Sequence, residues 1–239
     1  MGYFQQAHKK LCSVQAMPPA ACLFDLDGLL IDTEPLHGQA WRQAAAQFGI
    51  QLSTEQLFQL RGRRRQNCAE QVLSWIVDHG CQQSSMPTTD KLLSVQQPLA
   101  RRLLPMARAM PGAADLLANC RQLQLAMALV TSSGSEAVAL KSAAHPWLEL
   151  LELRVYGDDP ELMLGKPYPD PYLLAARRLG VDPSDCWAFE DSPAGVKSAM
   201  AAGCKVHVLA PPELDLSERE RLYGTPWRFL DSLQQVSFD

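Results

Sequence analysis

Short apolar runs alternate with helical stretches along most of this chain, from residue 20 to residue 212. Five of the apolar runs have strand length, which predicts buried strands within 20–25, 123–134, 153–157, 185–192 and 204–212, the last closed by Pro211 and Pro212. The segments between them, at 112–123, 135–144, 170–180 and 192–203, are typical of helices. Strands that alternate with helices imply an α/β fold, with a parallel, Rossmann-like sheet and helices on both faces.

Residues 36–105 interrupt this alternation. The segments 37–49, 54–62, 66–80 and Thr89–Ala109 all indicate helices, and no strand-like run lies among them. We therefore predict an inserted, all-helical cap domain at 35–105 and an α/β core made of 20–34 and 106–239. Residues 1–19 are predicted to be an N-terminal extension, either frayed or docked on the core as a short helix. The tail after residue 216 has a mixed pattern that predicts no definite element.

Composition supports a globular protein and excludes several classes. The chain has 239 residues, of which 47% are apolar, so it can bury a sizeable core. Its longest uncharged stretches, 11–24 and 122–135, fall short of the roughly 18 apolar residues of a membrane span, so we expect no membrane anchor. Seven cysteines without a CxxC pair indicate neither a disulfide framework nor a zinc site, but scattered thiols in a reducing, cytoplasmic setting.

Charge is unevenly distributed along the chain. The net charge of −4 gives no footprint for nucleic acid. Between residues 35 and 110, however, nine Lys and Arg residues accompany only four acids. A basic segment within an acidic chain suits an anionic ligand that meets a bound cation, and the alternative is a solvated helical face.

Polar side chains gather where the predicted strands end. Asp25 and Asp27 follow the first strand, residues 131–133 follow the second, and Glu190 and Asp191 follow the fourth. In an open parallel sheet, ligands bind in the crevice outside the carboxyl ends of the strands. We therefore expect these groups to converge at one site.

The residue types at this site suit phosphoryl transfer. Asp25, Asp27 and Asp191 would repel one another without a cation, and hard oxygen ligands favour Mg²⁺ over zinc. Thr131 and the amides after it offer donors to phosphate oxygens, and Lys166 adds a positive charge. One aspartate could attack phosphorus to form an aspartyl-phosphate. The other could protonate the leaving oxygen and then take a proton from water.

Four segments of the chain resemble, in order, the motifs of the haloacid dehalogenase-like hydrolases. They are FDLDGLLIDTE (24–34), VTSS (130–133), GKPYPD (165–170) and FEDSPAG (189–195). The likeness extends over roughly residues 20–210, and the helical insertion resembles the helical cap of that family. The nearest branch is that of the β-phosphoglucomutases and small sugar-phosphate phosphatases.

This resemblance implies a role for each catalytic candidate. Asp25 would be the nucleophile that becomes phosphorylated. Asp27 would be the general acid and base, and its backbone carbonyl would also bind Mg²⁺. Thr131 would hydrogen-bond the phosphoryl group, which Lys166 would bridge to the nucleophile.

The resemblance also implies metal and substrate contacts. Asp191 would be a Mg²⁺ ligand, with Glu190 in the outer shell or acting through water. Gly28 would let the chain turn tightly beneath the site. Ser132 or Ser133 would line the substrate side.

The cap offers further candidates. His37 resembles a histidine that this branch directs at the substrate, although it could simply occupy the first turn of a cap helix. Arg65, within the run 61–65, could clamp a second anionic group of the substrate. The branch often carries Ser or Thr near this run, so the arginines bear on the identity of the substrate rather than on the chemistry. Asp158 and Asp159 follow the third strand, where a role in the loop is favoured.

These features predict a Mg²⁺-dependent phosphatase that acts on a small phosphorylated metabolite, such as a sugar phosphate or a nucleotide. A phosphomutase remains the alternative, because it would use nearly the same motifs. A catalytically idle binding protein would be expected to lack Asp25, Asp27 or Asp191, and all three are present. We expect a monomer, with a dimer left open.

Overall fold

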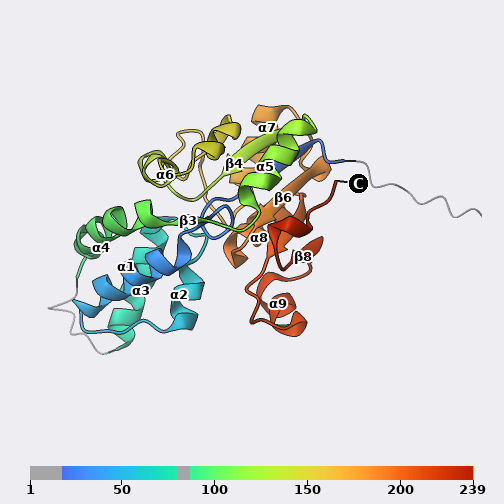
Figure 1. Ribbon diagram of the computed structural model, residues 1–239. Helices are drawn as coiled ribbons and strands as arrows, with labels where there is room; N and C mark the ends of the chain where they lie inside the picture. The colour runs from blue at the N-terminus through green and yellow to red at the C-terminus, as the bar shows by residue number, and fades with distance from the viewer. Residues whose placement is uncertain (1–17, 80–86, 239) are drawn as a thin grey trace, which may run out of the picture.

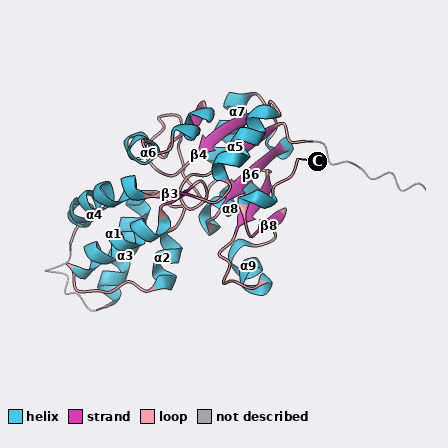
Figure 2. Ribbon diagram, viewed as in Figure 1, coloured by secondary structure: helices cyan, strands magenta, loops and turns pink. Residues whose placement is uncertain are grey.

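The computed structural model describes residues 18–79 and 87–238, and its main body is a six-stranded parallel sheet (Figures 1 and 2). The strand order is β5-β4-β1-β6-β7-β8. All five predicted strands are present, and β8 is an addition from the tail. The strands are β1 Ala21–Phe24, β4 Ala126–Val130, β5 Leu153–Val155, β6 Cys186–Glu190, β7 Lys205–Leu209 and β8 Arg228–Leu230.

Helices cover both faces of this sheet, as predicted. In β1, Cys22 and Phe24 belong to the apolar core beneath α5, whereas Ala21 and Leu23 belong to the core beneath α7 and α8. This alternation follows from the twofold periodicity of a strand. The α/β architecture is therefore confirmed. The helices of the sheet body are α5 Ala113–Gln122, α6 Ser135–Ser142, α7 Asp170–Leu179, α8 Pro193–Ala201 and α9 Leu216–Tyr223.

Four further helices pack beside the sheet body around an apolar core of their own (Figure 2). They are α1 Glu34–Ala46, α2 Thr54–Leu60, α3 Arg65–Asp78 and α4 Thr89–Leu103. The chain enters α1 from β2 (Ile31–Asp32) and leaves α4 toward β3 (Arg108–Ala109), and these two short strands pair antiparallel. A helical insertion is thus observed, while its predicted limits at residues 35 and 105 stay a prediction.

The structure corrects two expectations. The helix expected over Thr89–Ala109 ends at Leu103, where a short 3-10 turn begins with Leu104 and Pro105. Leu104 keeps helical backbone, but Pro105 has no N–H for the next α-helical hydrogen bond, and the chain passes through the 3-10 turn into β3. The tail, for which no element was predicted, forms α9 and β8.

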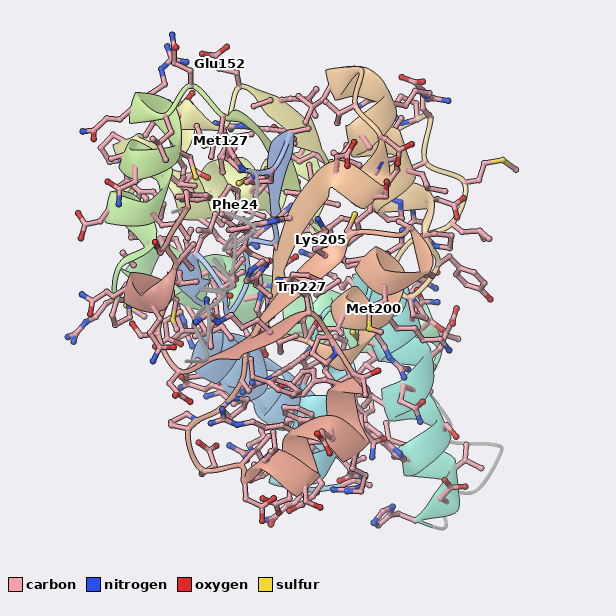
Figure 3. All side chains as sticks on the ribbon, turned by 90° about the vertical axis from the view of Figure 1, so that its right-hand side faces the viewer. Phe24, Met127, Glu152, Met200, Lys205 and Trp227 are labelled. Carbon is pink, nitrogen blue, oxygen red and sulfur yellow. The ribbon has the colours of Figure 1, made fainter. Side chains whose placement is uncertain are left out.

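One edge of the sheet is formed by β8, which pairs with β7. Figure 3 labels Lys205 on β7 near Trp227, and the lysine ammonium lies 5.4 Å from the centre of the largely exposed indole ring. In the described part of the chain, no helix is both long and apolar enough to cross a membrane. Most of the predicted N-terminal extension, residues 1–17, lies outside the described residues.

Candidate active site

The sheet brings the predicted polar groups to one edge because β4, β1 and β6 are neighbours. Asp25 directly follows β1, Thr131 follows β4, and Glu190 and Asp191 stand at the end of β6. All four side chains are buried, with 4% or less of each residue exposed. The convergence expected from the strand pattern is therefore present.

Lys166 joins the groups at the ends of these strands. Its Nζ donates to Asp25 Oδ1 at 2.6 Å, to Glu190 Oε1 at 2.5 Å and to the backbone carbonyl of Val130 at 2.9 Å. Tyr172 also donates its hydroxyl to Glu190 Oε1, at 2.6 Å. A buried ammonium needs such partners, and here they hold it against Asp25.

A cluster of carboxylates lies beside this lysine. Asp25, Glu190 and Asp191 each place one oxygen within 4.8 Å of the others. Burial raises the pKa of Asp25 to about 8, because the Lys166 ammonium offsets only part of the burial effect and the Glu190 carboxylate adds to it. Burial also raises the pKa of Asp191 well above its usual range, and the neighbouring Glu34 and Asp25 carboxylates add to this.

The cluster fits a hard divalent cation. Asp191 Oδ1 is buried and has no hydrogen-bond partner among the described residues. An unpartnered carboxylate oxygen beside other carboxylates is costly unless a cation is present, and all-oxygen ligands suit Mg²⁺. Gly28 lies against Asp191 with a φ of +83°, and a Cβ at this position would overlap the carboxylate. Gly28 thus shapes the backbone behind Asp191, and it is not among the residues that line the cavity described below.

Asp27 belongs to a second hydrogen-bond network, separate from the carboxylate cluster. Thr33 Oγ1 donates to its Oδ1 at 2.6 Å, and Ser133 Oγ donates to its Oδ2 at 2.8 Å. Lys141 Nζ donates to both oxygens, at 2.7 and 2.6 Å, and His37 Nε2 lies 3.4 Å from Oδ1. Burial opposes ionisation of Asp27, but Lys141 and His37 together outweigh it and hold the pKa of Asp27 well below its usual range.

Lys141 was not predicted as a site residue. It lies in the last turn of α6, and its side chain is fully buried. One signal was available: Lys141 follows Val138 by three residues, so both occupy the same, inward face of the helix. A lysine on a buried helical face needs an acidic partner, which points to one of the aspartates.

An ion pair that was also not predicted lies where the chain enters the helical insertion. Glu34, the first residue of α1, lies with its Oε2 3.1 Å from Arg61 Nε, and its side chain is 13% exposed. Burial raises the pKa of Glu34. Arg61 in turn lies over the Phe58 ring, 5.1 Å from the ring centre. Within the arginine run, Arg61 therefore makes its contacts within the protein.

The helical insertion also touches the sheet body directly. Ser132 Oγ donates to the carbonyl of Gly62 at 2.8 Å, and Gly62 has a φ of +70° and lies against Ser192. Arg64 donates to the carbonyl of Leu162 at 3.5 Å. Ser132 thus links the loop after β4 to the backbone of the insertion.

A cavity of about 960 Å³ opens between the insertion and the sheet body. Asp25, Asp27 and Thr131 line its base, and the predicted residues His37, Arg65, Ser132 and Ser133 also line it. Its remaining wall is partly apolar, and residues Trp41, Phe58, Leu214 and Leu222 contribute to it. His37 occupies the first turn of α1 and lies against Asp27, while its contact with the substrate stays a prediction.

The loop after β5 has a structural role, as favoured. Asp158 accepts from the backbone amide of Ser135 at 2.9 Å and so caps the start of α6. Asp159 accepts from Arg178 at 2.6 Å.

The fold and this site together define a class of enzyme. The sequence model of the haloacid dehalogenase-like hydrolases matches residues 19–203, and the chain belongs to this family.

Individual relatives point to phosphatases within that class. A probable pseudouridine-5'-phosphatase from Drosophila melanogaster is 37% identical over 198 residues, which are 81% of this chain and 82% of the relative. Hexitol phosphatase A from Escherichia coli is 34% identical, over 79% of this chain and 81% of that protein. The crystal structure of a β-phosphoglucomutase from Clostridium difficile superposes with a TM-score of 0.74 over 92% of this chain and 94% of that one. At 20% identity, the last match shows the shared fold alone.

Proposed function

We propose that this hydrolase is a Mg²⁺-dependent phosphatase that cleaves a small phosphomonoester, such as a sugar phosphate or a nucleotide, through an aspartyl-phosphate. The observation that carries the proposal is the environment of Asp25. Its carboxylate stands at the base of the cavity, bonded to Lys166 at 2.6 Å and grouped with Glu190 and Asp191 within 4.8 Å. The relatives described above, both phosphatases by name, support the same reaction.

The first step would transfer the phosphoryl group to Asp25. A carboxylate oxygen of Asp25 attacks phosphorus, and the bond from phosphorus to the substrate oxygen breaks. The Thr131 hydroxyl and the Lys166 ammonium stabilise charge on the phosphoryl oxygens. In the free enzyme Lys141 keeps the pKa of Asp27 low, and the negative charge of the bound substrate would raise it so that Asp27 takes up a proton. Asp27 then delivers this proton to the departing oxygen, which leaves as the alcohol.

The second step would return Asp25 to its starting state. Water attacks the phosphorus of the aspartyl-phosphate, and Asp27 takes a proton from that water. The bond between phosphorus and the Asp25 oxygen breaks, which releases inorganic phosphate. Asp27 is protonated again and ready for the next substrate.

Asp25, Asp191 and the backbone carbonyl of Asp27 would hold the Mg²⁺ ion, with Glu190 behind them. When bound, the ion neutralises the carboxylates and phosphoryl oxygens, so that an anionic nucleophile can meet an anionic substrate. The raised pKa values of Asp25 and Asp191 support this assignment, because added positive charge favours the ionised form of both carboxyls.

The cavity supports selection of the substrate by the helical insertion. Arg65 is exposed and lines the cavity, where its guanidinium could grip a second anionic group. The catalytic and metal-binding candidates all come from one chain, so we propose that a monomer suffices. The five described cysteines are free and buried, which suits a reducing compartment such as the cytoplasm.

A phosphomutase would use the same first step and has less support, because the relatives named above are phosphatases. The two activities differ in their product. A phosphatase releases inorganic phosphate, whereas a mutase returns the phosphoryl group to another hydroxyl of the substrate.

The test is a phosphate-release screen across phosphorylated metabolites, with and without Mg²⁺, for the wild type and Asp25→Asn. We expect Mg²⁺-dependent release that Asp25→Asn lowers on the order of 10³-fold or more. Asp185→Asn, at an exposed position just before β6, serves as the matched control and should keep its activity. Turnover by Asp25→Asn near the wild-type rate, with no reversion of Asn to Asp, would contradict the mechanism.

A further inference from the structure

Two buried lysines stand at this site, and each serves a different aspartate. Lys166 bonds Asp25 and Glu190, whereas Lys141 bonds Asp27 and Ser133. Both lysine side chains are fully buried. Burial of two ammonium groups is costly, so each must be held by its acid partner. The mechanism proposed above uses Lys166 and leaves Lys141 without a role.

Helix α6 aims Lys141 at Asp27. Side chains on a helix lean toward its N-terminus, so Lys141 points back along α6 toward Ser133, which precedes the helix. Lys141 Nζ donates to Ser133 Oγ at 2.8 Å, and Ser133 Oγ donates in turn to Asp27 Oδ2. The cap that Asp158 forms at Ser135 fixes the start of the same helix. Lys141 therefore belongs to a rigid element of the sheet body.

The contacts of Asp27 show what Lys141 adds. Thr33 and Ser133 each hold a single oxygen of the carboxylate, and His37 approaches only Oδ1. Of these four described partners, Lys141 alone contacts both oxygens. The last torsion of an aspartate is broad, so the plane of the carboxylate must be set by its partners. The two contacts from one ammonium set that plane.

We propose that Lys141 is a positioning residue that orients the Asp27 carboxylate for proton transfer to the leaving oxygen of the substrate. The inference rests on the proposed phosphatase function and on the role of Asp27 within it. Lys141 makes its contacts through Asp27 and Ser133, and it supplies neither the nucleophile nor a contact to Asp25.

This role predicts that the loss on removing Lys141 depends on the leaving group. An alkoxide such as that of benzyl phosphate needs a proton as it departs, whereas p-nitrophenolate departs readily as an anion. A correctly placed general acid is worth ~10²–10⁴-fold for a leaving group that needs the proton. Because kcat/KM covers only the steps up to departure of the leaving group, it isolates this effect from hydrolysis of the aspartyl-phosphate.

The experiment compares kcat/KM of the wild type, Lys141→Met and Lys141→Gln on benzyl phosphate and p-nitrophenyl phosphate. We expect each variant to lose about 100-fold on benzyl phosphate and less than about 3-fold on p-nitrophenyl phosphate. In an Asp27→Asn background, Lys141→Met should cause less than about 2-fold further loss, because the two residues act as one unit. Lys197→Met, at an exposed position on α8, is the matched control and should behave as wild type.

Three results would overturn the inference. Equal losses on both substrates would assign Lys141 to the nucleophilic step or to folding, and wild-type rates on both would leave it no role. An additional loss in the Asp27→Asn background would mean that Lys141 does not act through Asp27. If Lys141→Met does not fold, Lys141→Gln, whose amide can still donate a hydrogen bond, carries the comparison of the two substrates. Failure of the proposed function itself is distinct, because the wild type would then cleave neither substrate.

Discussion

Replacing Asp191 with asparagine should stabilise the metal-free protein and abolish its response to Mg²⁺. Asp191 is 4% exposed, has one oxygen without a hydrogen-bond partner among the described residues, and lies within the cluster formed with Asp25 and Glu190. The change to asparagine keeps the shape of the side chain and removes one negative charge. The same charge that destabilises the empty cluster is the one that would bind the cation.

The geometry of the cluster sets the size of the effect. Two full charges 4.8 Å apart interact with about 3.5 kcal/mol at an effective dielectric constant of about 20. The Lys166 ammonium, which bonds both Asp25 and Glu190, screens the cluster and lowers this value. We expect Asp191→Asn to raise the free energy of unfolding of the metal-free protein by about 1–3 kcal/mol. For a chain of this size, that corresponds to roughly 2–10 °C in Tm.

Thermal unfolding of EDTA-treated protein, with and without Mg²⁺, measures both effects. The assay is best run at pH 8.5, where Asp25, with a pKa of about 8, is mostly ionised. Wild-type Tm should rise when Mg²⁺ is added, since a ligand at 100 times its Kd stabilises by about 2.7 kcal/mol. Asp191→Asn should start from a higher Tm and gain nothing from Mg²⁺, while Asp185→Asn should follow the wild type.

Either of two results would contradict the prediction for Asp191→Asn. A lower Tm of Asp191→Asn in EDTA would mean that the carboxylate is stabilised by contacts other than a cation. An undiminished Mg²⁺-induced shift in the variant would mean that the ion binds elsewhere on the protein.

Two further predictions concern stability in acid and the choice of substrate. His207 is buried, and burial lowers its pKa from 6.5 to about 4. Between pH 6.5 and pH 4 the unfolded chain therefore binds one proton more than the folded protein, and the free energy of unfolding decreases as the pH falls through this range. This difference in proton binding is worth about 3 kcal/mol of stability. In urea unfolding, His207→Phe should therefore lose correspondingly less stability than the wild type between pH 7 and pH 4. An unchanged acid sensitivity of the variant would rule out His207 as its source. Arg65→Ala or His37→Ala should lower kcat/KM roughly 10- to 150-fold for the true substrate and far less for p-nitrophenyl phosphate, as losing one charge-assisted contact implies. Equal losses on both substrates would place these two residues in catalysis or folding rather than in substrate selection.

Local sequence patterns predicted most of the sheet and its polar edge. Apolar runs long enough for a strand located β1, β4, β5, β6 and β7 and predicted a parallel sheet. Because the carboxyl ends of parallel strands share one edge, the same pattern also predicted that Asp25 would meet Glu190 and Asp191, which the cluster confirms. The short strand β8 was not predicted, because only three residues form it and only one of them is buried.

Tertiary packing alone decided which partner each aspartate receives. The sequence pattern brings Asp25 and Asp27 to one edge, but Lys141 lies 114 residues from Asp27 and Lys166 lies 141 residues from Asp25. Periodicity can show that a lysine occupies a buried helical face, yet it cannot specify which acid that face will meet. That choice depends on how α6 packs on the sheet and where the helical insertion joins it, because a buried ammonium is tolerated only where packing supplies its counter-charge. The sequence by itself thus determined the chemistry at the edge of the sheet, and the folded structure determined how that chemistry is divided between two lysine–aspartate pairs.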